Sequence, residues 1–284
     1  MPEHPIAGTL FVVATPLGNL EDMTLRAIRM LRDVDLVACE DTRRTATLLR
    51  AHGVETPTTS FFEHNERWKG ARILEVVRQG RDVALVSDAG TPGISDPGYR
   101  LVRDARAAGL SVVPVPGPSA AIAALSVSGL PSDRFMFVGF LPARAGARRR
   151  AIEELASERA TLVVYESPLR VVETRATMAE LLGDREAFLC REAPKLHEEY
   201  LRARLSDLHQ RLASRDTVKG EIVLVVAGRP EAAPLAGADP IALYRTLAAS
   251  GRTRRDAVKE AARQLGLPAR EVYSLVQESE DQAE

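Results

Sequence analysis

The feature that most constrains the fold of this sequence is a regular alternation between short, β-branched apolar runs and longer amphipathic stretches. The short runs predict buried strands, and apolar residues that recur every three or four positions predict helices. This alternation is typical of a parallel sheet with helices on both faces and right-handed crossovers. In the first half of the chain we predict strands at 10–14, 36–39, 83–86 and 111–115, and helices at 24–31, 42–51, 68–79, 99–108 and 120–127.

The second half of the chain continues with another α/β pattern, and a length of 284 residues fits about two domains. Its predicted strands lie at 135–138, 162–165, 187–190 and 222–226, with helices around Ala151 and Val172. We therefore predict an α/β fold with two α/β domains and a small C-terminal helical segment, which are placed at 1–118, 119–230 and 239–277. A Pro/Ala/Gly linker is expected at 230–239, and the acidic residues 278–284 are expected to be frayed.

The composition limits the possible partners and ligands. The formal net charge is −1, so the chain as a whole is not a polycation and any contact with nucleic acid needs a local basic patch. Both cysteines, Cys39 and Cys190, lie in predicted strands, which favours buried thiols over a redox role. The sequence has no His/Cys cluster, no signal-peptide pattern and no run of about 18 apolar residues, so we expect a cytoplasmic protein without metal or membrane contact.

Polar or glycine-rich loops follow four of the predicted strands in the first half of the chain. They span 15–20, 40–43, 87–98 and 116–120. Because open parallel sheets bind ligands beyond the carboxyl ends of their strands, these loops predict a cleft with close backbone approach. The loop at 87–98 has 12 residues, and ordering a loop of that length costs enough entropy to suggest a function.

Each loop also has a purely structural interpretation. A Pro-Gly loop is usually a turn, and Asp41 is in position to cap the helix that follows it. No GxGxxG, GxxxxGK[ST] or GxSxG motif occurs, which argues against dehydrogenase, NTPase and α/β-hydrolase functions. Among the five histidines only His64 lies beside other functional-looking groups, and a surface or capping histidine is the favoured interpretation of it.

The loop sequences resemble one family strongly. The pieces GTPLGNLEDMTLRA, EDTR, HNE, SDAGTPGISDPG, VPGPSA, GLPSDRF and GFLPA occur in this order, followed by YESPLR, CREAPKLHEEY and KGEIVLVVAG. They are similar to the ribosomal RNA small subunit methyltransferase I family, a branch of the tetrapyrrole methylase superfamily. The resemblance implies two α/β domains of the class III methyltransferase type, with S-adenosylmethionine folded in the cleft between them, and a homodimer. It implies methylation of the 2′-hydroxyl of a cytidine in the decoding region of 16S rRNA.

The resemblance also implies which residues bind S-adenosylmethionine. The chain departs from the wider superfamily at 87–89, where Ser-Asp-Ala replaces Gly-Asp-Pro, as is typical of the ribosomal branch. Asp88 suits an ammonium group or a ribose hydroxyl. The implied cofactor-binding residues are Pro16, Leu17, Ser87, Asp88, Gly90, Thr91, Ser119, Ala120, Tyr165, Glu166, Val223 and Leu224.

A ribose hydroxyl is a poor nucleophile at neutral pH, so a general base would accelerate its methylation by about 10²–10⁴. Four candidates remain open, namely Glu40, Asp41, His64 and Asp88. RNA contacts need positive charge, for which ordinary solvated surface is the alternative interpretation. The main RNA-binding candidates are Arg43, Arg148, Arg149, Arg150, Arg254, Arg255 and Lys259, with Arg44 and Arg144 as further ones. Arg191 and Lys195 fit RNA, cofactor or dimer contacts equally well.

The C-terminal helical segment resembles a helix-turn-helix module with Gly266 in its turn. Between Arg245 and Glu271 it carries seven Lys or Arg and three acidic residues, which predicts a phosphate-binding face. A helical cap over the second domain or the dimer seam is the alternative. For the whole chain, the alternatives are a precorrin-type tetrapyrrole methyltransferase and a non-catalytic ribosome-binding module. The basic segment disfavours the former, and the intact set of loops disfavours the latter.

Overall fold

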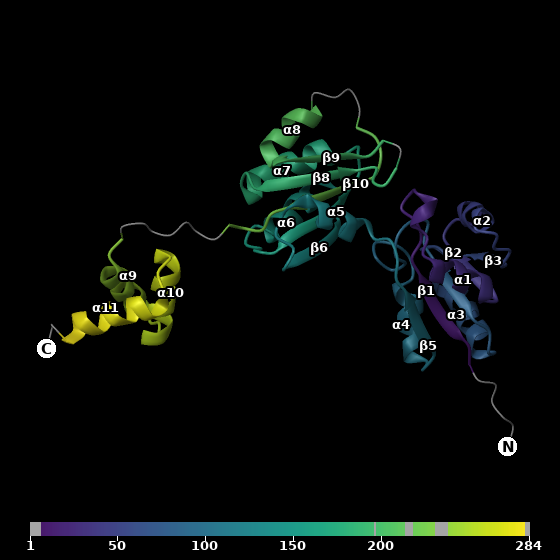
Figure 1. Ribbon diagram of the computed structural model, residues 1–284, viewed down its shortest axis with the longest axis horizontal. Coiled ribbons are helices and arrows are strands. Elements are labelled where there is room, and N and C mark those ends of the chain that lie inside the picture. Colours follow the sequence, from purple (N-terminus) through teal and green to yellow (C-terminus); the bar gives the residue numbers. More distant parts are fainter. Residues whose placement is uncertain (1–6, 196, 214–217, 231–237, 282–284) are drawn as a thin grey trace, which may run out of the picture. The chain divides into compact units, whose positions relative to one another are not determined.

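The computed structural model describes residues 7–195, 197–213, 218–230 and 238–281. The chain forms two compact units, 1–229 and 230–284, which are described separately. Within these described ranges, unit 1 contains two five-stranded sheets with their helices, and unit 2 contains three helices (Figure 1). The predicted α/β fold with a C-terminal helical segment is thus confirmed.

The first sheet is entirely parallel, with the strand order β3-β2-β4-β1-β5. Its strands are β1 (Thr9–Val13), β2 (Leu36–Cys39), β3 (Thr58–Ser60), β4 (Val83–Val86) and β5 (Ser111–Val115). The helices are α1 (Leu25–Asp33), α2 (Thr42–Ala51), α3 (Glu66–Arg78) and α4 (Tyr99–Ala107), and a 3-10 turn spans Leu20–Asp22.

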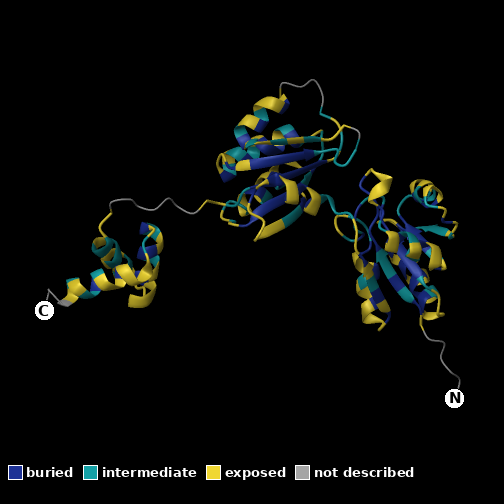
Figure 2. Ribbon diagram, viewed as in Figure 1, coloured by how far each residue is buried: buried dark blue, intermediate teal, exposed yellow. Residues whose placement is uncertain are grey.

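Alternate side chains of β4 explain why helices cover both faces of this sheet. Val83 and Leu85 pack in a core with residues of α3 and α4, whereas Ala84 and Val86 pack with residues of α1 and α2. All four residues of β4 are buried (Figure 2). A central strand that is apolar on both faces requires this sandwich, so the β-branched runs of the sequence predict the layered arrangement correctly.

The second sheet is mixed, with the order β6-β7-β10-β8-β9, and only β6 and β7 are parallel. Its strands are β6 (Phe135–Phe140), β7 (Thr161–Glu166), β8 (Glu186–Arg191), β9 (Glu199–Arg204) and β10 (Ile222–Val226). Helix α5 (Ala120–Ser128) packs on one face. The other face is covered by α6 (Ala145–Glu154), α7 (Val171–Leu182) and α8 (Leu205–Ala213).

Unit 2 is a small bundle of α9 (Pro240–Ala249), α10 (Arg254–Leu265) and α11 (Ala269–Asp281). Thr253 caps α10, and Gly266 ends it with a φ of 67°, a conformation that favours glycine. The expectation that 278–284 are frayed is wrong for 278–281, because α11 continues through them, and 282–284 lie outside the described residues. Most of the predicted linker, 231–237, also lies outside them.

The sequence does not predict the strands β3 and β9, the helix α8 or the 3-10 turn at Leu20–Asp22. The boundary proposed at 118/119 stays a prediction. Helix α5 begins at Ala120 and packs on the second sheet, and both sheets belong to one compact unit. Cys39 and Cys190 are buried and unpaired, as expected. Within the described ranges, no helix is both long enough and apolar enough to cross a membrane.

Candidate functional site

The glycine-rich loops that follow the strands of the first sheet are joined to one another by hydrogen bonds. The backbones of Thr15 and Gly90 exchange two hydrogen bonds, of 2.8 and 3.0 Å. The Thr15 hydroxyl donates to the Ser87 carbonyl at 3.0 Å, and the Thr91 hydroxyl donates to the Pro118 carbonyl at 3.2 Å. The loops after β1, β4 and β5 therefore form one edge, as the parallel-sheet rule predicts.

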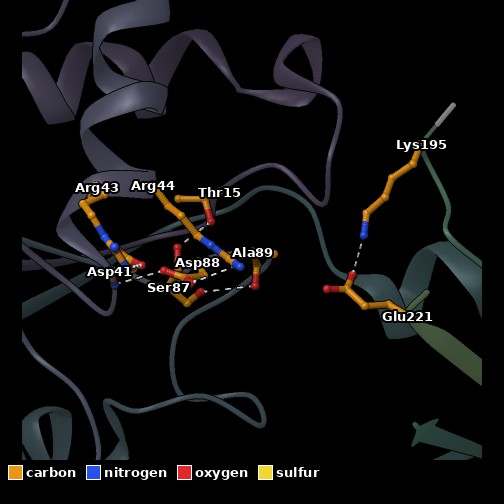
Figure 3. A network of polar contacts seen from close by, with 9 residues as sticks. All are labelled: Thr15, Asp41, Arg43, Arg44, Ser87, Asp88, Ala89, Lys195 and Glu221. Atoms are coloured by element: carbon orange, nitrogen blue, oxygen red, sulfur yellow. Dashed lines mark hydrogen bonds and ion pairs between the residues drawn. The ribbon is translucent and has the colours of Figure 1, made fainter. Parts of the chain in front are cut away.

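Asp88 joins the loop after β2 to this edge (Figure 3). One of its carboxylate oxygens accepts a hydrogen bond from the Asp41 backbone N–H, and the other pairs with the Arg44 guanidinium, both at 3.1 Å. The Asp88 side chain is 21% exposed, so it keeps one side open to a ligand. Asp88 thus holds two loops together and still faces outward.

A cavity of about 570 Å³ opens at this edge, and we call it the loop cavity. A volume of this size is typical of small-molecule sites. One wall comes from the first sheet and the other from the second. Of the predicted cofactor-binding residues, the cavity is lined by Leu17, Asp88, Gly90, Thr91, Ser119, Ala120, Tyr165, Glu166 and Val223.

Three of the predicted cofactor-binding residues do not line the loop cavity, and all three are buried. Pro16 precedes Leu17, which does line it. The Ser87 hydroxyl bonds back to the carbonyls of Ala89 and Gly90. Leu224 is wrong as a side-chain contact, because it points to the opposite face of β10 and packs against α6, α7 and α8.

Glu166 lines the loop cavity, but its carboxylate is occupied within the protein. It accepts hydrogen bonds from the Ser167 N–H and the Thr174 hydroxyl, each at 2.6 Å, and pairs with Arg170 at 2.9 Å. The Glu166 side chain has no solvent exposure. Its carboxylate therefore anchors the start of α7. This arrangement argues against the predicted contact between the Glu166 carboxylate and the cofactor.

Sequence reasoning missed part of the cavity wall. Asp96 lies in the same 12-residue loop as Asp88, and Glu221 precedes β10. Lys195, for which the sequence allows RNA, cofactor or dimer contacts, lines the cavity and donates hydrogen bonds to Glu192 and Glu221 at 3.1 and 3.0 Å. The repeated Ser-Asp in the loop at 87–98 was the available signal for Asp96. Further unpredicted lining residues are Ala89, Ile94, Ser95, Ala123, Phe140, Ser167, Pro168, Cys190, Glu192, Ala193, Gly220 and Ile222.

The four candidate bases lie in different surroundings. Asp41 caps α2 and pairs with Arg43, and these contacts lower its pKa to about 2, so it is a poor base. Burial raises the pKa of Glu40, and the nearby Asp88 carboxylate adds to this rise. His64 is exposed, with its ring edge-on to Phe62. Glu40 and His64 line a second cavity, and Asp88 lines the loop cavity.

The arginines of unit 1 that were predicted to contact RNA already form ion pairs or hydrogen bonds within the protein. Arg148 is only 2% exposed and pairs with Glu173 at 2.7 Å, so its prediction as an accessible phosphate contact is wrong. Arg149 makes a bidentate pair with Glu180, Arg150 bonds the Gly146 carbonyl, and Arg43 is 90% exposed while paired with Asp41.

In unit 2, Arg254 bonds Glu280 and Gln277 and lies over the Tyr273 ring. Arg255 and Lys259 are exposed on α10. In the part of the chain that the structure describes, no group of three or more His, Cys, Asp or Glu residues is arranged to hold a metal ion.

Comparison with known proteins gives concordant matches. Residues 9–209 match the family model of the Tetrapyrrole (Corrin/Porphyrin) Methylases. The chain is 44% identical over 274 residues to Ribosomal RNA small subunit methyltransferase I of Halalkalibacterium halodurans, covering 94% of each chain. It is 50% identical over 247 residues to the protein of that name from Pseudomonas aeruginosa, covering 86% of this chain and 88% of the other.

Two solved structures share the fold. Uroporphyrin-III-C-methyltransferase from Thermus thermophilus matches with a TM-score of 0.55 and 24% identity over 78% of this chain and 94% of that one. A diphthine synthase matches with a TM-score of 0.61 and 18% identity over 78% of this chain and 89% of that one. At these identities the likeness concerns the fold alone.

Proposed function

Because the chain belongs to the ribosomal RNA small subunit methyltransferase I family, within the tetrapyrrole methylases, we propose that it methylates RNA of the small ribosomal subunit. The methyl donor is S-adenosylmethionine, and the acceptor is the ribose 2′-hydroxyl of a cytidine in the decoding region of 16S rRNA. A protein with this substrate acts in the cytoplasm. The observation that carries the proposal is the loop cavity, where glycine-rich backbone and carboxylates meet.

The residues of the loop cavity fit S-adenosylmethionine, which combines an adenine, a ribose, an amino-acid head and a sulfonium cation. Leu17, Phe140 and Val223 offer apolar surface to the adenine. Gly90 adopts a φ of 81°, and a Cβ there would lie 3.4 Å from the Leu17 side chain, so glycine keeps the backbone open to the ligand. Asp88 and Asp96 face the same cavity and suit the positively charged groups.

The protein's own contribution to the reaction is positioning. When bound, the cofactor supplies a methyl group that is already activated by the positive sulfur. The loops hold donor and acceptor in line, and such positioning supplies about 7–11 kcal/mol of barrier lowering. Tyr165 fixes the second wall, because its hydroxyl accepts a hydrogen bond from the Ala121 N–H at 3.2 Å and its ring contacts Phe137 and Phe140.

A homodimer is part of the proposal. Apolar side chains are exposed on α5 and on the edge strand β6, with Ile122 at 51%, Val127 at 58% and Phe135 at 42%. An edge strand with an apolar rim is a ready surface for a second copy of the chain. Light scattering at micromolar concentration should give twice the monomer mass, and a stable monomer would reject the dimer.

Unit 2 is proposed to dock the rRNA. Its core is formed by residues such as Val258, Ala261 and Val272, which leaves Arg255 and Lys259 exposed. Deleting 238–284 should leave cofactor affinity intact, weaken binding to the small subunit and flatten its salt dependence, since fewer counterions are released. An unchanged affinity with the same salt slope would identify unit 2 as a structural cap instead.

The central experiment mixes the purified protein with labelled S-adenosylmethionine and small subunits that lack the modification. We expect label on one cytidine ribose. Label on a tetrapyrrole and not on RNA would favour the precorrin-type alternative. Failure to bind the cofactor, with no label on either substrate, would favour a non-catalytic ribosome-binding module.

A further inference from the structure

A second cavity, of about 760 Å³, lies beside the loop cavity. It is formed within the first α/β domain, between the loop after β2, the start of α3 and the start of α4, and we call it the Tyr99 cavity. Ser95 and Asp96 line both cavities and so form their common wall. A group transferred from a ligand in one cavity to a ligand in the other would therefore pass beside these two residues.

The backbone at this common wall is held in an unusual shape. Ser95 has a φ of 61°, which is uncommon for a residue with a side chain. Gly98 has a φ of 133°, and a Cβ there would lie 2.8 Å from the Leu85 side chain. The buried Glu66 carboxylate accepts a hydrogen bond from the Gly98 N–H at 3.2 Å and fixes the loop to α3. Backbone strain that its surroundings hold in place is typical of functional sites.

Asp96 stands among other carboxylates. Burial raises its pKa to about 6, the carboxylates of Glu40, Asp88 and Glu221 add to the rise, and a hydrogen bond with Ser87 opposes it. A carboxylate with such a pKa is a better proton acceptor near neutral pH than an ordinary one.

The rim of the Tyr99 cavity suits a nucleotide. Tyr99 is the first residue of α4, and it is 69% exposed although it is aromatic. An exposed aromatic ring is a stacking platform for an unpaired base. Arg67 and Arg100 lie on the same rim, and Arg100 is only loosely paired with Glu66, at 3.8 Å. Guanidinium groups at this position suit the phosphates on either side of the base.

We propose that the Tyr99 cavity binds the acceptor nucleotide and that the Asp96 carboxylate is the general base for its 2′-hydroxyl. This inference rests on the proposed function and adds the place of the acceptor and the identity of the base. Glu40 and His64 line the Tyr99 cavity alone, and Asp88 lines the loop cavity alone. Asp96 is the acidic residue that faces both, so it can meet the acceptor oxygen where the methyl group arrives.

The transfer uses one base and no further reactant. The acceptor oxygen forms its bond to the methyl carbon while the carbon–sulfur bond breaks, and the electron pair of that bond stays on the sulfur. The hydroxyl proton passes to a carboxylate oxygen of Asp96 and afterwards to solvent. The products are a 2′-O-methyl ribose, a neutral thioether and a protonated Asp96, which loses its proton before the next turnover.

Substitution of the base tests the chemical step. Asp96→Asn should lower kcat on unmodified small subunits by about 100-fold or more. Because Asp96 also lines the loop cavity, kcat is measured at saturating cofactor, and cofactor affinity is measured separately by calorimetry. Asp33→Asn, which removes an exposed carboxylate at the end of α1 that lines neither cavity, is the control and should keep its activity. A kcat for Asp96→Asn within about threefold of the parent would overturn the assignment, and a large loss in Glu40→Gln alone would transfer it to Glu40.

Substitution of the rim tests the place of the acceptor. Tyr99→Ala should raise KM for small subunits by about tenfold with little change in cofactor affinity, because a stacking partner of the base is lost. Tyr99→Phe keeps the ring and should behave like the parent. If Tyr99→Ala leaves KM unchanged while the parent methylates RNA, the Tyr99 cavity is not the acceptor site. If the parent itself transfers no methyl group to RNA, it is the proposed function that fails.

Discussion

The two sheets of unit 1 have five strands each in the part of the chain that the structure describes, but the ends of these strands are arranged differently. In the first sheet all strands are parallel, so every loop that follows a strand lies at the same edge. In the second sheet β7 and β8 run antiparallel to β10. The residues just before β10 therefore lie beside the carboxyl ends of β7 and β8. The first sheet therefore forms its half of the loop cavity from post-strand loops, and the second also uses the approach to β10.

This difference determines which kind of residue each sheet contributes. Val223 pairs with Tyr165 and Cys190 in the register of the second sheet, and all three line the cavity. They belong to strands, so the neighbours that lie deeper in those strands, Val164, Leu189 and Leu224, point to the opposite face. The first sheet contributes loop residues such as Asp88 and Gly90, whose position depends on turns. In the first sheet, the side chains that line the cavity are therefore found in the loops after the strands. In the second sheet, they are found at alternate positions along the strands.

The largest expected effect comes from two neighbours on β10. Leu224→Ala should lower the free energy of unfolding by about 2–5 kcal/mol, because Leu224 is fully buried among α6, α7 and α8. The affinity of the folded variant for S-adenosylmethionine should not change. Val223→Ala, on the cavity face, should weaken cofactor binding with a smaller loss of stability. Denaturant unfolding and calorimetry on both variants give the test. A loss of cofactor affinity in Leu224→Ala but not in Val223→Ala would contradict the assignment of Val223 to the cavity face of β10.

Asp88→Ala tests the loop side of the comparison. We expect the affinity for S-adenosylmethionine to fall about 10- to 100-fold, because a carboxylate hydrogen bond to a charged group contributes about 1.5–3 kcal/mol. Asp88 also joins the loops through Asp41 and Arg44, so part of the loss would be positional. Arg44→Ala is the control, because it breaks the ion pair and leaves the carboxylate. Unchanged affinity in Asp88→Ala by calorimetry would reject its role.

Particular residues explain how far the sequence predicted this structure. Strands β2, β4, β5 and β10 were predicted with their observed bounds because their apolar runs end abruptly. The three-residue strand β3 is polar and partly exposed, so it carries no hydrophobic signal. Glu166 and Leu224 were predicted to bind the cofactor from sequence motifs. A motif does not show that Leu224 points to the helical face of β10, or that the Glu166 carboxylate is occupied by contacts at the start of α7. Asp96 depends on the fold of its loop, because only the path of the loop brings it to both cavities.

The helical face of the second sheet contains a buried cation, which gives a prediction on stability. Arg175 is fully buried on α7, and neither terminal nitrogen of its guanidinium has a hydrogen-bonding partner among the described residues. Burial lowers its pKa to about 10. Arg175→Met should therefore raise the free energy of unfolding by about 1–2 kcal/mol, since an apolar side chain of similar length avoids this desolvation.

Arg185 offers a matched control for that experiment. It is also buried, but its guanidinium donates to the carbonyls of Leu182 at 2.9 Å and Ala156 at 2.6 Å. Arg185→Met should destabilise the protein, because it leaves these carbonyls without a donor. If both variants lose stability to the same extent, Arg175 has a partner that stabilises it in solution.

The smallest expected effect concerns Asp96 and changes with pH. Its pKa is raised to about 6 in the folded protein from an ordinary value near 3.8, so between these values the folded state binds more protons than the unfolded state. Stability must then fall as the pH rises from about 4 to about 6. Asp96→Asn removes this titration and should be more stable than the parent above pH 6, with the difference disappearing near pH 4.

Solvent reaches part of the Asp96 side chain, and screening reduces the expected gain to about 1 kcal/mol. Glu63→Gln removes one exposed negative charge from the same cavity and controls for the change in net charge. Thermal or denaturant unfolding at pH 4, 6 and 8 measures the difference. A gain in stability together with a loss of activity is the pattern of a group held in an unfavourable place for its function. An equal difference at all three pH values would mean that the Asp96 carboxyl group does not titrate differently on folding, and it would remove this argument for Asp96 as the base.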